Sequence, residues 1–194
     1  MLNRQDIDRA LDLLGGELAR RRIEAELVLL GGASLLARAL TARGTIDIDV
    51  LGVRMPDGSV LSAHPLPSEV RVAADVVAGA MGLDPMWLDD RPASDFVNAA
   101  PDGYEGRLER AVHGSLVVWH LSRFDICVIK IIASAERWGE RPNKHWDDVR
   151  QLKPTTEELS AARVFARRIW TPSSAAWASL TSIEEVLHGG AERR

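Results

Sequence analysis

Apolar residues recur along the chain with two different periods, which separate candidate helices from candidate strands. Near the N-terminus the steps of four and three predict an amphipathic helix, carried by Ile7, Leu11, Leu14 and Leu18. Asn3 precedes it as an N-cap, whereas Gly15 and Gly16 weaken the helix in its middle. The uniformly apolar run from Leu27 to Leu30 is typical of a short buried strand.

The stretch from Leu27 to Gly52 reads as strand, glycine turn, helix and second strand. Gly31 and Gly32 have no Cβ, so the backbone can turn sharply there and come close to a ligand. Helical spacing of apolar residues then predicts a helix from Ala33 to Ala42, with Ser34 in its first turn. Free N–H groups in a first helical turn attract phosphate, which makes this turn a candidate phosphate site.

The second strand alternates in character and carries two acids. Its period of two places Asp47 and Asp49 on one face, opposite a face formed by Ile46, Ile48 and Val50. Mg²⁺ favours one or two protein carboxylates together with phosphate oxygens of a substrate. The two aspartates beside the glycine turn therefore predict a magnesium site.

The middle of the chain predicts a helix, a long loop and a hairpin. Apolar spacing indicates a helix from Ser68, its expected cap, to Met81. The Pro-, Asp- and Gly-rich segment from Gly82 to Gly106 reads as loop with one helical turn around Trp87. A hairpin is expected from two strand-like runs that flank His113-Gly114-Ser115, namely Leu108–Val112 and Leu116–Leu121.

The remaining residues predict only helices. The first runs from Ser122 to about Trp138, and a second starts at Asn143. A third is capped by Thr155 or Thr156 and extends through Trp170, and the last spans about Ser173 to His188 and stops at Gly189-Gly190.

Composition narrows the class of protein. With 194 residues, 46% hydrophobic and 27% charged, the chain suits one domain or one domain with a helical extension. No apolar run is long enough to span a membrane, and we expect no export peptide. The single cysteine, Cys127, excludes an internal disulfide and favours the cytoplasm.

Charge bears on possible partners. The net charge of −4 argues against a broad nucleic-acid-coating surface but allows a polynucleotide to be gripped locally. Two basic clusters could either bind a polynucleotide locally or be ordinary solvated faces. They are Arg20 to Arg22, and Arg137, Arg141 and Lys144.

The string GG-A-S followed, about a dozen residues later, by R-G-T-I-D-I-D resembles the signature of the nucleotidyltransferase superfamily. The arginine and threonine before the acids resemble its bacterial toxin branch of AbiEii and MenT type. The resemblance implies an α+β fold: a polymerase β-like nucleotidyltransferase core over residues 1–121, and a C-terminal helical bundle over 122–194 that completes the active site in one structural unit. The competing interpretation is a plain helix-start turn next to two solvated acids.

A second segment follows the pattern of the same branch. Lys130, Ala133 and Arg137 on one helix, and then Lys144 to Asp148, match its lysine helix and its K-D-x-x-D segment. His145 stands where the family often has an acid, which shifts the expected role to Asp148, with Asp147 second. Lys130, in an apolar helix, must either extend to solvent or meet an anion, and the resemblance favours contact with a triphosphate.

One departure concerns the third carboxylate that many nucleotidyltransferases carry on a later strand. The run LVVWHL offers only His120, which as a neighbour of Trp119 is more often structural than a metal ligand. Asp148 is the better candidate for the missing charge.

By resemblance, the site divides into named roles. Asp47 and Asp49 would hold Mg²⁺; Gly31, Gly32 and Ser34 would hold the β- and γ-phosphates. Lys130 would neutralise the triphosphate, and Asp148 would act as a general base or orienting group. Arg43 would bind phosphate, although an arginine at a helix end pairs as readily with a carbonyl.

The function implied is transfer of a nucleotide from an NTP to an RNA acceptor, a tRNA 3′ end, by a growth-blocking toxin with a cognate antitoxin. Thr45 lies on the face of Asp47, and in some MenT-type toxins a hydroxyl at the matching position is phosphorylated by the antitoxin, so the resemblance makes Thr45 a candidate regulatory site; the alternative is an ordinary strand residue, since threonine suits a strand. One rival is a nucleotidyltransferase that modifies a protein hydroxyl or a small molecule such as an aminoglycoside. Another is a nucleotide-binding regulatory module without turnover.

Overall fold

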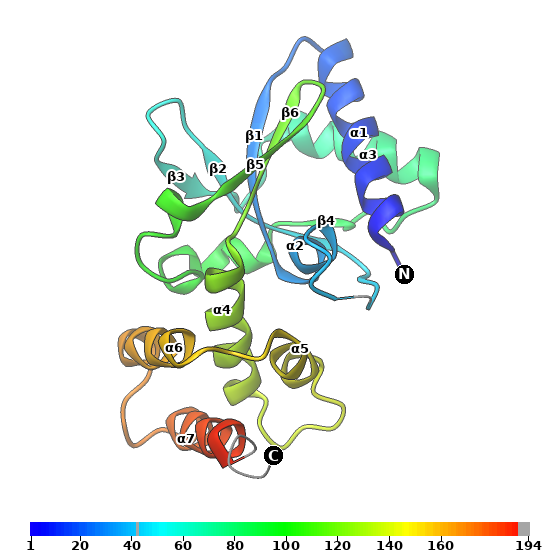
Figure 1. Cartoon of the computed structure of the whole chain (residues 1–194). Coiled ribbons are helices and arrows are strands. Elements are labelled where there is room, and N and C mark those ends of the chain that lie inside the picture. The colour runs from blue at the N-terminus through cyan, green and yellow to red at the C-terminus, as the bar shows by residue number, and fades with distance from the viewer. Residues whose placement is uncertain (42, 190–194) are drawn as a thin grey trace. The chain divides into compact units, whose positions relative to one another are not determined.

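A computed structural model describes residues 1–41 and 43–189, without the side chains of residues 96–98, 188 and 189. The chain divides into two compact units (Figure 1). The first contains residues 1–99 and 103–122, and the second contains residues 100–102 and the chain from Arg123 onward. Among the described helices, none combines the length and the apolar character needed to cross a membrane.

The first unit begins with helix α1 (Arg4–Arg20), which confirms the predicted helix and its cap. The side chain of Asn3 accepts a hydrogen bond from the Asp6 N–H at 3.1 Å, and Asp6 in turn accepts one from the Asn3 N–H at 3.0 Å. The apolar stripe is fully buried, with Ile7, Leu14 and Leu18 at 0% exposure. The two glycines do not interrupt the helix, because its packing outweighs their weak helical propensity.

Gly15 and Gly16 differ in their surroundings, which leads to a testable contrast. A Cβ on Gly15 would lie 1.5 Å from the backbone oxygen of His113, whereas one on Gly16 would meet nothing within 4 Å. We expect Gly15→Ala to lower the free energy of unfolding by about 3 kcal/mol through overpacking. The matched control, Gly16→Ala, should raise it by up to about 1 kcal/mol. Urea unfolding of both variants measures the difference, and equal stabilities would show that α1 does not pack this closely.

The strands of the first unit form one mixed sheet. They are β1 (Ala25–Leu30), β2 (Ile48–Arg54), β3 (Val60–Ser62), β4 (Leu88–Asp89), β5 (Glu109–His113) and β6 (Leu116–His120). Their order is β3-β2-β1-β6-β5, and the short β4 pairs with β2. β1 runs antiparallel to β2 and parallel to β6, while β5 and β6 form the predicted antiparallel hairpin. The predicted opening of helix, strand, helix and strand is confirmed.

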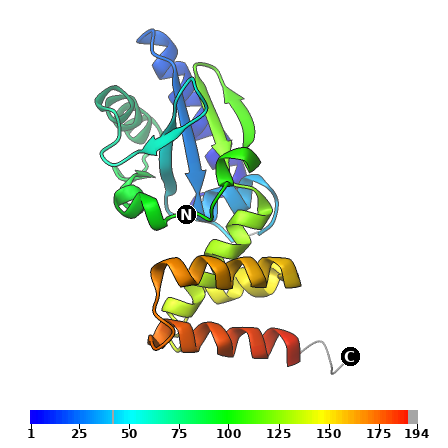
Figure 2. The same ribbon diagram turned by 90° about the vertical axis from the view of Figure 1, so that its left-hand side faces the viewer.

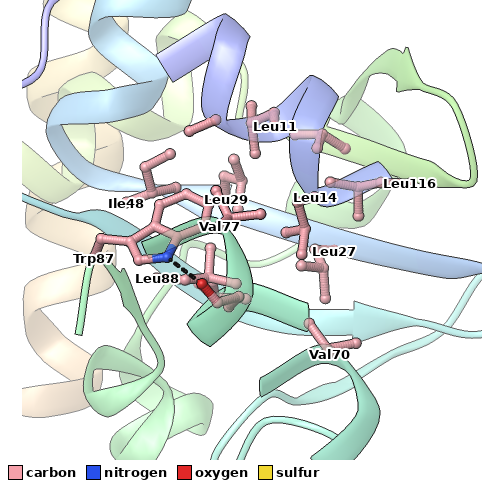
Figure 3. Packing of buried hydrophobic residues seen from close by; sticks show 14 of the residues in the cluster. Leu11, Leu14, Leu27, Leu29, Ile48, Val70, Val77, Trp87, Leu88 and Leu116 are labelled. Atoms are coloured by element: carbon pink, nitrogen blue, oxygen red, sulfur yellow. Dashed lines mark hydrogen bonds between the residues drawn. The ribbon is translucent and has the colours of Figure 1, made fainter. Parts of the chain in front are cut away.

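Helices α1 and α3 (Ser68–Met81) pack against each other, and both contribute to the main hydrophobic core (Figures 1 and 3). In Figure 3, Leu11 and Leu14 of α1 approach Leu27, Leu29 and Leu116 of the sheet. The predicted extent of α3 is confirmed, but its N-cap is Pro67, without a side-chain hydrogen bond, and not Ser68.

The segment from Gly82 to Gly106 contains more structure than the predicted loop. Besides β4 it forms two 3₁₀ segments, η1 (Arg91–Asn98) and η2 (Tyr104–Arg107). Trp87 does not sit in a helical turn; its ring is fully buried, and its Nε1 donates a hydrogen bond to the Ala74 carbonyl at 3.0 Å (Figure 3). The indole fixes the residues that follow it, and these residues form β4.

Between residues 123 and 189 the second unit consists of helices and the loops that join them, as predicted. Its helices are α4 (Arg123–Glu136), α5 (Lys144–Leu152), α6 (Thr156–Ile169) and α7 (Ala175–Gly189). The other three pack on α4, which runs through the middle of the unit (Figure 2). Asn143 caps α5, and Thr155 caps α6 through a reciprocal pair with Glu158. The predicted stop at Gly190 lies outside the described residues. The mixed sheet with helices confirms the α+β class.

Candidate active site

The turn after β1 leads directly into helix α2 (Gly31–Ala37). Gly31 has a φ of 76°, and a Cβ there would lie 1.8 Å from the Asp49 Oδ2, so both backbone and space require glycine. The helix begins earlier and ends sooner than the predicted Ala33–Ala42, since Ala39 adopts a φ of 55°. Residue 42 lies outside the described residues. A Cβ on Gly32 would lie 3.1 Å from the Thr45 Oγ1, so this turn also lies against Thr45.

Three aspartates converge beside this turn. One carboxylate oxygen from each of Asp47, Asp49 and Asp89 lies within 4.8 Å of the others. Asp49 is brought to the turn because it pairs with Leu30 at the end of β1. Asp47 immediately precedes β2, which starts at Ile48. Ile46 therefore also lies outside the strand, so it does not belong to the buried strand face that was predicted for it, and it is 68% exposed.

Asp89 is the carboxylate that sequence reasoning missed. It pairs in register with Asp49, because β4 runs parallel to β2. Within the first unit the third ligand candidate is therefore Asp89 and not His120; the contribution of Asp148 remains a prediction. Only the acid pair Asp89-Asp90 in the sequence could have pointed to it, and a strand of two residues has no hydrophobic period to reveal it.

Asp89 is itself engaged by an arginine. Its Oδ1 accepts a hydrogen bond from the Arg91 Nε at 2.8 Å, and its Oδ2 accepts one from Nη2 at 2.7 Å. The same Oδ1 accepts one from the Arg91 backbone N–H at 3.0 Å. These bonds from Arg91 hold the pKa of Asp89 below its ordinary value although partial burial opposes them. Three carboxylates at this spacing suit Mg²⁺, which takes hard oxygen ligands.

Thr45 lies beside the cluster, as the alternation indicated. Its Oγ1 donates a hydrogen bond to the Asp47 Oδ1 at 3.3 Å, and its side chain is almost fully buried. Its backbone forms an antiparallel bridge with Leu2, which fixes the approach to the acids. A group added to this hydroxyl would therefore lie next to Asp47.

Ser34 and His120 form a buried pair under the turn. Ser34 is fully buried, and its Oγ lies 3.4 Å from the His120 Nδ1. Burial, together with the nearby charge of Arg38, lowers the pKa of His120 to about 4, so the imidazole is neutral at physiological pH. Arg43 is half-buried, and its backbone N–H donates to the Thr41 Oγ1 at 3.1 Å. The phosphate-binding roles of Ser34 and Arg43 remain predictions.

In the second unit, Lys130 meets an anion of the protein itself. Its Nζ lies 2.8 Å from the Asp148 Oδ2, and the two side chains are only 6% and 1% exposed. Lys130 therefore does not extend to solvent, and its contact with a triphosphate remains a prediction. The neighbouring Asp147 is exposed.

His145 lies near this ion pair. Burial and the charge of Lys130 lower the pKa of His145 to about 3, so its imidazole is neutral. A neutral imidazole cannot act as a counter-ion for Lys130. The paired carboxylate of Asp148 provides that charge.

Comparison with known proteins agrees with this geometry. No curated protein and no solved structure matches the chain. One family model does match, described as a nucleotidyltransferase of unknown function (DUF6036), and it covers residues 5–141. The matched region contains the glycine turn, the three aspartates and Lys130. Since the match extends over well more than half of the chain, the protein belongs to this nucleotidyltransferase family.

Proposed function

We propose that the protein is a Mg²⁺-dependent nucleotidyltransferase toxin that transfers a nucleoside monophosphate from an NTP to an RNA acceptor, a tRNA 3′ end. The observation that carries the proposal is the convergence of Asp47, Asp49 and Asp89 beside the Gly31 turn in a member of a nucleotidyltransferase family. The toxin branch, the tRNA acceptor and the cognate antitoxin rest on the resemblance of the R-G-T-I-D-I-D string. The proposal places the protein in the cytoplasm.

The residues of the first unit fit the charge pattern of phosphoryl transfer, which depends mainly on positioning and neutralisation. Asp47, Asp49 and Asp89 would hold Mg²⁺, which when bound activates the acceptor hydroxyl and neutralises phosphate charge. The turn at Gly31 and Gly32 brings the backbone close to the acids, where its N–H groups would bind the β- and γ-phosphates. In the proposal, the Ser34 hydroxyl and Arg43 add donors to the same phosphates.

In the second unit, Lys130 and Asp148 would complete the machinery. Lys130 would neutralise charge on the triphosphate or on the departing pyrophosphate. The 2.8 Å contact between Lys130 and Asp148 favours the orienting role for Asp148, because its Oδ2 already holds the Lys130 ammonium in place.

The test is incubation of the purified protein with labelled NTPs, Mg²⁺ and total cell RNA, together with proteins and small solutes of the cell. We expect the label in RNA of tRNA size, and expect it to be lost when Mg²⁺ is chelated. Label in protein or in a small solute would favour the rival acceptors, a protein hydroxyl or an aminoglycoside. Binding of NTP with no label anywhere would favour the non-catalytic regulatory module.

Thr45 provides a prediction about control. A phosphate brings roughly −1.5 to −2 charges at neutral pH. Attached to the Thr45 Oγ1, which lies 3.3 Å from the Asp47 Oδ1, it would repel the triphosphate and draw Mg²⁺ away from the acids. We expect Thr45→Glu to be folded but inactive, while the matched control Thr45→Ser stays largely active. Label transfer and circular dichroism of both variants check this; near wild-type transfer by folded Thr45→Glu would refute the switch.

A further inference from the structure

Arg91 is placed to act on the acid cluster, although nothing in the sequence motif includes it. Its side chain is 68% exposed, whereas the side chain of Asp89, which it holds, is 6% exposed. The guanidinium contacts both oxygens of that carboxylate, through Nε at 2.8 Å and Nη2 at 2.7 Å. Asp89 shares the three-acid cluster with Asp47 and Asp49, so the guanidinium of Arg91 lies directly against a member of that cluster.

This pairing conflicts with metal binding at the same oxygens. A bidentate guanidinium engages the carboxylate lone pairs that a divalent cation would take. Asp89 does not depend on the guanidinium for its position, because β4 pairs with β2 and the Arg91 backbone N–H also donates to the Asp89 Oδ1 at 3.0 Å. The guanidinium can therefore leave while the carboxylate remains in place.

We propose that Arg91 is a nucleotide-binding residue that holds Asp89 while the cluster carries no metal and binds the triphosphate once Mg²⁺ replaces it there. The inference rests on the proposed function. The released guanidinium stays beside the cluster, because Arg91 follows Asp89 by only two residues. A planar guanidinium binds phosphate oxygens bidentately, and its exposed, flexible side chain allows the exchange. The arginine thus exchanges one anionic partner for another.

The exchange predicts that replacing Arg91 strengthens Mg²⁺ binding but weakens triphosphate binding. In Arg91→Gln, the Mg²⁺ concentration at the midpoint of thermal stabilisation should fall about two- to fivefold, since an exposed competing ion pair is removed. Binding of inorganic tripolyphosphate in saturating Mg²⁺, measured by calorimetry, should weaken about tenfold or more, since a charge-assisted contact is lost. Arg91→Lys should keep part of the tripolyphosphate affinity. Arg4→Gln, which removes an exposed pair with Asp8, is the control and should change neither measurement.

The outcomes separate this inference from the proposed function. If Mg²⁺ does not stabilise the wild-type protein, the proposed metal site itself fails. If Mg²⁺ stabilises the wild type but Arg91→Gln needs more Mg²⁺, or binds tripolyphosphate as tightly as before, Arg91 only orients Asp89 and the exchange is refuted. A lower Mg²⁺ midpoint together with weaker tripolyphosphate binding supports it.

Discussion

Asp89→Asn is expected to reduce nucleotide transfer by about a hundredfold or more, as severely as Asp47→Asn, although Asp89 lies far along the chain from the motif. One oxygen of Asp89 lies within 4.8 Å of oxygens of Asp47 and Asp49, so in the proposed function the three would act as one set of ligands. An amide in place of one carboxylate removes a negative charge from the proposed site of a divalent cation. The loss should be only partly recovered by raising the Mg²⁺ concentration.

The measurement is label transfer from NTP over a Mg²⁺ titration, with folding followed by circular dichroism. Asp75→Asn is the matched control, because Asp75 is exposed on α3 and belongs to no cluster of acids that the structure describes. Its activity should be unchanged. If Asp89→Asn is folded and transfers label at the wild-type rate in low Mg²⁺, Asp89 is not a metal ligand, and Asp47 and Asp49 remain as the candidates of this cluster.

The contrast between Asp49 and Asp89 shows what the sequence could predict. Asp49 belongs to a continuous stretch in which strand, glycine turn, helix and strand follow within Leu27–Gly52, so local periodicity was sufficient. Asp89 reaches the site through β4, a two-residue strand whose pairing with β2 depends on the buried ring of Trp87 and the Ile48 N–H bond to the Trp87 carbonyl at 2.6 Å. A contact of this kind is set by tertiary packing, which no short window contains.

The ion-pair partners of charged residues could likewise not be predicted from the sequence. Arg20 and Arg21 read as a basic cluster along the chain, but both pair with Glu17 one turn earlier in α1. Lys130 read as a cation available to a ligand, but it is buried against Asp148. Sequence spacing shows where charges lie along an element. Whether a charge is neutralised depends on an ion-pair partner on the next turn or the next helix.

The buried pair of Lys130 and Asp148 provides the second large effect. Lys130→Met leaves the Asp148 carboxylate, 1% exposed, without its cation, and Asp148→Asn leaves the Lys130 ammonium without its anion. We expect each single variant to lower the free energy of unfolding by about 3 kcal/mol or more, because breaking a buried ion pair by removing one partner is costly. The double variant should cost clearly less than the sum of the two, because neither charge remains. Urea unfolding of all four proteins gives the coupling energy.

Activity in the double variant decides what the pair does. If Lys130 contacts the triphosphate, the double variant should be folded yet inactive, because stability is regained without the cation. If the pair only joins α4 to α5, transfer should recover together with stability, and the assignment of Lys130 to the active site would be wrong. The half-buried pair of Arg163 and Glu184, between α6 and α7, is the matched control. Arg163→Met/Glu184→Gln should change the free energy of unfolding by about 1 kcal/mol or less and leave transfer intact, because partly exposed ion pairs contribute little.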